Sequence, residues 1–400
     1  MTISWTSAFA YSYFSLPLLF SFSYIFTSFT NSFCRFDLRV FKFVLVPFIF
    51  TSFYYILVAI INPHIKVINY TLVYIFLPLL FCYLPLLIKI NKDKVKNIED
   101  YFIYSLLFIA LLCILESIVR FYFGFDITSL VPQLKGNEAY TLTSSGEVLN
   151  RSRGLSSEPM IVGLYLCVGL QHILIKLKNT FLSGSKGYGR KTLIYLGYSF
   201  IFIFAILTTG SASSFIISFF GFLLLLSEVI YKFVFDLNNR KINLNILKIF
   251  LCVIFLICGF LFILEIIPAY KVAVENIIGK ISLDKDFTSV RQRLLIFKQY
   301  FDYFISDPLG LKGSLGFYSS KTSAINWYMT LLGDVGIIGT FFTLMPISTS
   351  ILLVINSPYK NNFSRFDKLF LIVIPLFGLL FHGTFYASPL WATILLTYYL

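Results

Sequence analysis

Two pairs of arginines with the same spacing are the residues of this chain best suited to chemistry. Arg151 and Arg153 lie in the stretch RSRGLSSEPMIVG, and Arg291 and Arg293 repeat the spacing in SVRQRL. The guanidinium group binds phosphate through two parallel hydrogen bonds and stabilises negative charge that develops on a leaving group. If the fold brings the two pairs together, the four arginines form a site for a phosphate or pyrophosphate group.

Few side chains are candidates for exchanging a proton at such a site. Glu158 precedes Pro159, and because proline fits the first position of a helix, Glu158 is the predicted N-cap of an apolar helix. The helix dipole and the arginines favour its ionised form, so it either acts as a weak base or only holds the arginines in position. His382, in FHGTFYASPLW, is the second candidate.

Other charged side chains fall within apolar segments, where each needs either a charged partner or a functional role. Glu116 and Arg120 are four residues apart, so they either pair on one helix face or line a cavity. Glu228 and Asp334 have no evident partner in the sequence and are expected near the ends of spans. Since no CxxC motif or cluster of His and Cys is present, we expect no metal and no cofactor.

The elements that must position these side chains are apolar helices. Of the 400 residues, 58% are hydrophobic and only 13% are charged, which is typical of an all-α polytopic membrane protein in a lipid bilayer. We expect a single membrane domain, residues 1–400, with about eleven spans. These are Ser7 to Phe29, Val40 to Ile61, Ile68 to Ile88, Tyr101 to Phe123, Met160 to Ile175, Thr192 to Thr209, Ser211 to Tyr231, Ile246 to Ile267, Trp327 to Val354, Leu369 to Phe381 and Ala387 to Leu400.

The distribution of charge predicts the orientation of the spans. The net charge is +13, and more than half of the 32 Lys and Arg residues fall in the odd-numbered loops, which the positive-inside rule places in the cytoplasm. The N-terminus is then outside and the C-terminus inside. The other basic residues concentrate in two long outer loops, residues 124–158 and 268–326, which hold both arginine pairs. The positive charge is thus explained by topology and by these loops, without a nucleic-acid partner.

The second outer loop contains a predicted amphipathic helix, residues 290–307. Its apolar positions recur at helical spacing while basic and acidic residues share another face, so the helix is expected to lie along the membrane surface. The apolar positions are Leu294, Phe297, Phe301, Phe304 and Ile305.

Three stretches of the chain resemble the group of O-antigen polymerases (Wzy-type) and O-antigen ligases. They are RSRGLSSEPMIVG, then TTGSASSFIISFFGFLLLL, and then the series SVRQRL, DPLGLKGSLGF and INWYMTLLGDVGIIG. Two positions differ from the pattern of the family. Ala212 stands where the family often has an arginine, and Ile325 stands where ligases tend to have a histidine, which favours a polymerase over a ligase.

The resemblance implies a GT-C-like, metal-independent, inverting glycosyltransferase in the bacterial inner (cytoplasmic) membrane, with its active site on the periplasmic, extracytoplasmic face. The implied substrate is an undecaprenyl-pyrophosphate-linked oligosaccharide, which is polymerised into O-antigen or capsule polysaccharide. A chain-length regulator and a flippase are the implied protein partners. The alternatives are an O-antigen ligase and, from another class, a flippase or transporter of lipid-linked oligosaccharides.

The resemblance and the chemistry of the side chains together predict the roles of individual residues. The donor pyrophosphate is expected to bind Arg153 and Arg291, and Glu158 or His382 is expected to accept the proton of the attacking sugar hydroxyl. These are the predicted catalytic residues. The predicted substrate-binding residues are Arg151, Arg293, Asn326 and Tyr328.

Overall fold

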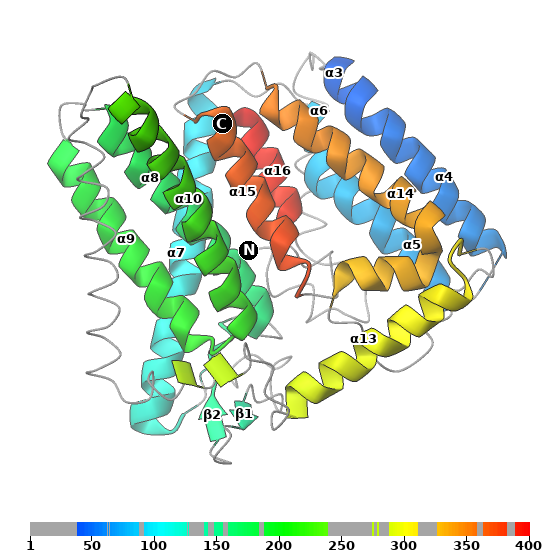
Figure 1. The fold of residues 1–400 in the computed structure, drawn as a ribbon, viewed down its shortest axis with the longest axis horizontal. Coiled ribbons are helices and arrows are strands. Elements are labelled where there is room, and N and C mark those ends of the chain that lie inside the picture. Colours follow the sequence, from blue (N-terminus) through cyan, green and yellow to red (C-terminus); the bar gives the residue numbers. More distant parts are fainter. Residues whose placement is uncertain are drawn as a thin grey trace. The chain divides into compact units, whose positions relative to one another are not determined.

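The computed structural model is almost entirely helical in the part of the chain that it describes (Figure 1). The described residues are 38–61, 63, 65–87, 92–125, 127, 140–142, 148–154, 159–183, 188–238, 274–275, 278–279, 288–310, 326–357, 363–381 and 389–400. They belong to two compact units, one formed by Met1–Glu99 with Thr288–Leu400 and the other by Asp100–Phe287. We call these unit 1 and unit 2.

Six helices among the described residues are long and apolar enough to cross a membrane, which confirms that the protein is a helical membrane protein. They coincide with six of the predicted spans and comprise Leu38–Ile61, Glu99–Phe123, Pro159–Phe181, Gly189–Thr208, Ala212–Tyr231 and Trp327–Ile355. The predicted spans at residues 7–29 and 246–267 lie outside the described residues. The total of about eleven spans and the GT-C-like architecture therefore stay predictions.

The other three predicted spans are shorter or interrupted helices. The third consists of α5 (Ile65–Pro78), the π-helical turn η2 (Leu79–Tyr83) and α6 (Leu84–Leu87). Because Pro78 has no backbone N–H, the regular hydrogen bonding is interrupted where the π-helix begins. The last two are α15 (Arg365–Gly378) and α16 (Leu390–Tyr399).

Unit 1 is organised around α14 (Trp327–Ile355), which packs along α4 (Val46–Ile61) and contacts α16 (Figure 1). The short α3 (Leu38–Val40) and η1 (Phe41–Leu45) precede α4 without a break. The buried indole of Trp327 donates a hydrogen bond to the Tyr74 hydroxyl of α5 at 2.9 Å. The hydroxyls of Tyr55 and Thr343 lie 2.7 Å apart and connect α4 to α14. Such polar contacts add directional bonds to the packing of apolar helices.

The helix α13 (Thr288–Ser306) is joined to α14 by two glycines. Gly310 follows α13 with φ +71°, and Gly336 interrupts α14 with φ +62°. The two backbones touch, so that a Cβ on Gly310 would overlap the carbonyl of Val335 and a Cβ on Gly336 would overlap Gly310. The Ile337 amide donates to the Pro308 carbonyl at 2.9 Å. We call this contact the glycine joint; only residues without a side chain permit it.

A helix, α13, is present over Thr288–Ser306, which nearly matches the range predicted for the amphipathic helix; its place along the membrane surface stays a prediction. Most of its apolar side chains are exposed, whereas Tyr300 is buried and lies against Gly333 of α14. Arg293, Lys298 and Asp302 are also exposed. An exposed apolar stripe next to charged residues is typical of a helix in the membrane interface. The exposed apolar residues are Leu294, Leu295, Phe297, Phe301 and Ile305.

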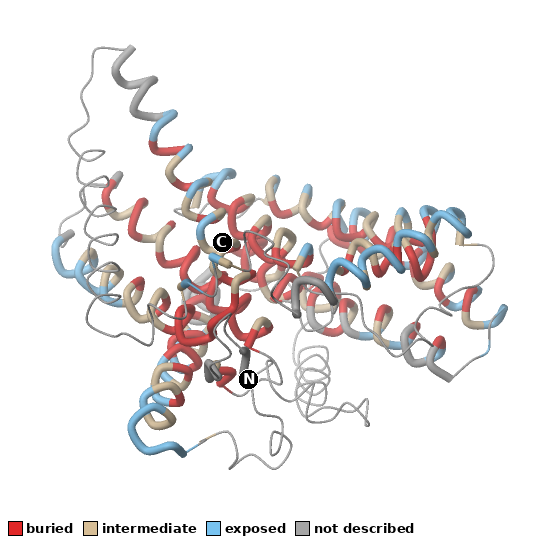
Figure 2. Tube along the Cα trace, turned by 60° about the horizontal axis from the view of Figure 1, so that its bottom comes forward, coloured by how far each residue is buried: buried red, intermediate tan, exposed pale blue. Residues whose placement is uncertain are grey.

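Unit 2 contains α7 (Lys92–Phe123) from Asp100 onward, followed by α8 (Pro159–Ser183), α9 (Tyr188–Thr208) and α10 (Ala212–Asn238). The span of α8 is 89% buried, whereas only 33% of the span of α9 and 39% of that of α10 are buried. In Figure 2, several helices have buried residues on one side and exposed residues on the other. Because α8 contacts both α9 and α10, it forms the centre of this unit.

A small antiparallel ribbon lies at one end of unit 2 (Figure 1). Its strands are β1 (Tyr140–Leu142) and β2 (Val148–Asn150), with Tyr140 paired to Asn150. Only a loop was predicted for these residues from the sequence. The ribbon matters for the site because β2 runs directly into Arg151.

Candidate functional site

The RSRG segment, Arg151 to Gly154, is attached to the turn between α9 and α10. The Ser152 amide donates to the Thr208 carbonyl, and the Arg151 Nε donates to the Thr209 carbonyl, both at 2.9 Å. The turn passes through Gly210, whose φ is +54° and where a Cβ would lie 3.2 Å from Cγ of Arg151. These contacts place the segment at the end of the unit where α9 ends and α10 begins.

The same segment is held from another side by Glu116 of α7. The Oε2 atom of Glu116 accepts hydrogen bonds from the Arg153 amide at 3.0 Å and the Gly154 amide at 2.8 Å. Its Oε1 atom is 3.3 Å from Nη2 of Arg120, and Nη1 of Arg120 donates to the Arg151 carbonyl at 3.3 Å. The predicted pairing of Glu116 with Arg120 is confirmed, and the structure adds that the pair binds the backbone of the RSRG segment.

Arg153 is 1% exposed and is one of the largest fully buried side chains of the described residues. Burying a charge away from water has a high free-energy cost unless the charge is paired. The groups around a buried guanidinium must therefore compensate its charge. Several hydroxyl-bearing residues of the segment and of the adjoining turn are buried as well. They are Ser152, Thr208, Thr209, Ser211, Ser213 and Ser214.

The helix α8 begins at Pro159, as predicted from the preference of proline for the first helical position. Its residue Gly163 lies against Ser214 of α10, so that a Cβ there would overlap the serine hydroxyl. The start of α8 is therefore packed tightly against the start of α10. The predicted acid-base residues, Glu158 and His382, lie outside the described residues, and their roles stay predictions.

The second arginine pair belongs to unit 1. Arg291 and Arg293 lie near the start of α13, and the side chain of Arg293 is exposed. The side chain of Arg291 lies outside what the structure describes. The predicted meeting of the two pairs in one cleft stays a prediction.

The two remaining predicted substrate-binding residues have contacts within unit 1. Asn326 is the N-cap of α14, where its Oδ1 accepts from the Met329 amide at 3.2 Å. The Tyr328 hydroxyl donates to the Leu376 carbonyl of α15 at 2.9 Å. Both side chains thus stabilise helix ends and helix contacts, and binding of a glycan by them stays a prediction.

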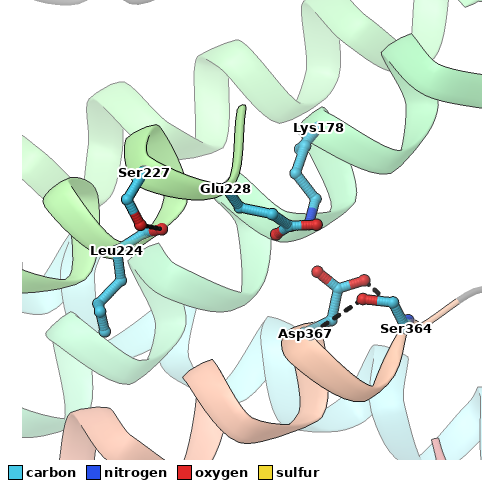
Figure 3. Close-up of polar contacts among 6 residues, drawn as sticks. All are labelled: Lys178, Leu224, Ser227, Glu228, Ser364 and Asp367. Atoms are coloured by element: carbon cyan, nitrogen blue, oxygen red, sulfur yellow. Dashed lines mark hydrogen bonds and ion pairs between the residues drawn. The ribbon is translucent and has the colours of Figure 1, made fainter. Parts of the chain in front are cut away.

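A second group of charged residues lies toward the C-terminal end of α8. The Lys178 ammonium is 2.6 Å from the Glu228 carboxylate, and both side chains are buried (Figure 3). Lys176 and Asp100 form a wider pair at 3.9 Å. Glu228 has no evident partner in the sequence. Lys178 and Glu228 are far apart in the sequence, so their spacing does not indicate that they pair. Only the general rule that a charge in a span needs a partner pointed to such a pair.

The described residues contain no group of three or more His, Cys, Asp or Glu side chains placed to hold a metal ion. Within the same residues Cys82, Cys113 and Cys167 are free and buried. Arg120, Arg151 and Arg153 bring guanidinium groups to the RSRG segment.

Comparison with known proteins gives no match for this chain, either among protein-family models or among curated proteins.

Proposed function

We propose that this protein is a polysaccharide polymerase, which transfers a growing glycan from undecaprenyl pyrophosphate to a lipid-linked repeat unit at the outer face of the bacterial inner membrane. The observation that carries the proposal is the burial of Arg153 on a backbone segment fixed at one end of apolar helices. Ionisable residues among membrane helices are costly, and they commonly mark substrate sites.

The chemistry of arginine indicates the class of substrate. A guanidinium group at the end of membrane spans lies at the level of lipid headgroups, where the phosphate of a lipid carrier is located. Arg153 and Arg151 provide two such groups on one segment, which is hydrogen-bonded to α7 and to the turn after α9. In surroundings of low dielectric constant, fixed positive charge stabilises a pyrophosphate leaving group more strongly than it would in water.

The proposed reaction is a single displacement at the anomeric carbon of the donor sugar. A hydroxyl of the acceptor sugar forms the new C–O bond while the bond to the pyrophosphate oxygen breaks, so the configuration is inverted. The pyrophosphate leaves with the electron pair, and the arginines stabilise its charge. Glu158, or alternatively His382, accepts the proton of the attacking hydroxyl.

The proposal is tested with purified protein in liposomes that contain lipid-linked repeat units and no other acceptor. We expect a ladder of products from the wild type and no ladder from Arg153→Ala. The matched control is Arg190→Ala, which removes an exposed arginine at the start of α9. A wild type that binds the repeat units but forms no ladder would indicate a ligase, and translocation without elongation would indicate a flippase.

The role of Glu158 is tested in the same assay with Glu158→Gln, which keeps the shape of the side chain and removes its basicity. A general base contributes about 100-fold to 10,000-fold to the rate, so we expect a loss of that order in kcat. Near-normal activity would show that Glu158 is structural, and His382→Ala would then be the next variant to measure.

A further inference from the structure

We infer that Glu116 is a positioning residue for the two arginines of the RSRG segment. The inference rests on the proposed function, because it concerns the same site. Glu116 is 2% exposed and lies on α7, outside the segment that carries the arginines. It acts through the backbone of that segment and not by contact with the substrate.

The first support is the way in which the carboxylate binds the segment. One oxygen accepts hydrogen bonds from two successive amides, those of Arg153 at 3.0 Å and of Gly154 at 2.8 Å. Hydrogen bonds to a carboxylate are stronger than those between neutral groups. The two amides belong to the peptide groups on either side of the Arg153 Cα, so both bonds together fix the backbone of Arg153 and the direction in which its side chain leaves it.

The second support is that the same carboxylate reaches Arg151 through Arg120. Arg120 is held by Glu116 at 3.3 Å and donates to the Arg151 carbonyl, also at 3.3 Å. Arg151 in turn donates through Nε to the Thr209 carbonyl at 2.9 Å. A chain of contacts thus connects Glu116 to the backbone of both arginines and to the turn that follows α9.

The arrangement favours positioning over proton transfer as the role of Glu116. Both carboxylate oxygens already have partners, and the side chain is buried. Removing the carboxylate would release the backbone of Arg153 while leaving its guanidinium group chemically unchanged. A displacement of about 1 Å at a reacting centre lowers rates by about 100-fold, so the expected effect on catalysis is large.

The experiment measures kcat and KM for elongation of lipid-linked repeat units by Glu116→Ala and Glu116→Gln. We expect Glu116→Ala to lower kcat by about 100-fold. Glutamine retains an oxygen that can accept from both amides, so Glu116→Gln should recover most of that loss. If Glu116→Ala does not fold, Glu116→Asp replaces it, because its shorter side chain draws the carboxylate away from the amides.

The matched control is the double variant Lys178→Met with Glu228→Gln. It removes a buried carboxylate and its cation from the same unit, but at the other end of α8. We expect its kcat to stay within about twofold of the wild type, in keeping with the independence of distant sites. A loss as large as that of Glu116→Ala would show that any buried pair of this unit matters equally, and the inference would be wrong.

A double-mutant cycle with Arg153 separates positioning from general stability. The cycle uses Arg153→Lys, which keeps a positive charge and so leaves activity to measure; if Glu116 acts through Arg153, Glu116→Ala should lower kcat less in the Arg153→Lys background than in the wild type. If the two replacements lower kcat independently, so that their separate fold-losses multiply in the double variant, the inference is wrong.

Amide hydrogen exchange in liposomes distinguishes failure of this inference from failure of the proposed function. We expect Glu116→Ala to accelerate exchange at Arg153 and Gly154, while the control double variant leaves both amides protected. Unchanged exchange in Glu116→Ala would overturn the inference even if the wild type forms a ladder. If exchange is faster in Glu116→Ala but the wild type forms no ladder, Glu116 does hold the segment and the proposed function is wrong. The expected effect on catalysis is then wrong as well.

Discussion

Lys178 and Glu228 show at the scale of single residues what a charge within an apolar helix requires. Their charged groups are 2.6 Å apart and both side chains are buried (Figure 3). Separating the pair would leave one charge without a counter-ion in surroundings that solvate it poorly. Glu228 therefore fits in its helix only because Lys178 lies opposite.

This arrangement makes a prediction about stability. Replacing Glu228 alone by Gln, or Lys178 alone by Met, should lower the free energy of unfolding by about 3 to 5 kcal/mol, because one buried charge loses its partner. The double replacement should recover most of the loss. Thermal unfolding of the purified protein in detergent measures the three variants, and a double variant less stable than either single variant would contradict the explanation.

The role of Glu116 could be predicted only in part from the sequence. Its pairing with Arg120 follows from the spacing of four residues on one helix, which is a local property. Its hydrogen bonds to the amides of Arg153 and Gly154 do not, because backbone amides occur at every position and carry no signal in the sequence. The sequence indicated which residues are suited to phosphate chemistry, but not which residue holds them in place.

At the scale of elements, α13 and α14 show how a glycine motif allows two helices to come into close contact. The stretch LLGDVGIIG resembled a family pattern, and the structure gives a physical reason for two of its glycines. Gly333 lies against Tyr300 of α13, and Gly336 lies against Gly310 in the glycine joint. The motif therefore attaches the amphipathic helix to a membrane span.

The glycine joint makes a prediction with a matched control. Gly310→Ala should destabilise the protein by about 2 kcal/mol or more, since the new Cβ meets the Val335 carbonyl and φ is positive. Gly124→Ala is the control, because its φ is also positive but nothing lies within 4 Å of the new Cβ, so only the backbone strain of about 1 kcal/mol is expected. Thermal unfolding should separate the two variants; equal losses would show that the joint contributes no packing.

The exposed apolar face of α13 makes a second prediction at this scale. A polarity-sensitive fluorophore attached at Phe297→Cys or Phe301→Cys should be quenched by spin-labelled lipids in liposomes, because both side chains are exposed on the apolar stripe. The same fluorophore at Lys298→Cys or Asp302→Cys should be quenched much less. Equal quenching at all four positions would argue against an interfacial orientation of this helix.

For the whole molecule, the orientation in the membrane is the prediction that the sequence makes most directly. The distribution of Lys and Arg places the first turn of α9 in the cytoplasm and the segment after α7 outside. Phe125 is exposed, and Gly189 has nothing within 4 Å of an added Cβ, so cysteines are tolerated at both positions. In intact spheroplasts an impermeant maleimide should label Phe125→Cys but not Gly189→Cys. The reverse labelling pattern would show that the predicted orientation is wrong.

At the same scale, several features were determined by the sequence alone. The positions of six membrane helices, the bounds of the helix α13, the start of α8 at Pro159 and the pairing of Glu116 with Arg120 were all predicted. The physical reason is that apolar length, helical periodicity, helix-start preferences and spacings of four residues depend only on neighbours along the chain.

The tertiary structure alone decided which distant groups meet. It placed Glu116 on the amides of the RSRG segment, Lys178 opposite Glu228, and Gly310 against Gly336. These contacts depend on how the helices pack against one another. Packing is set by the fit of many side chains at once, and no local pattern in the sequence encodes that fit.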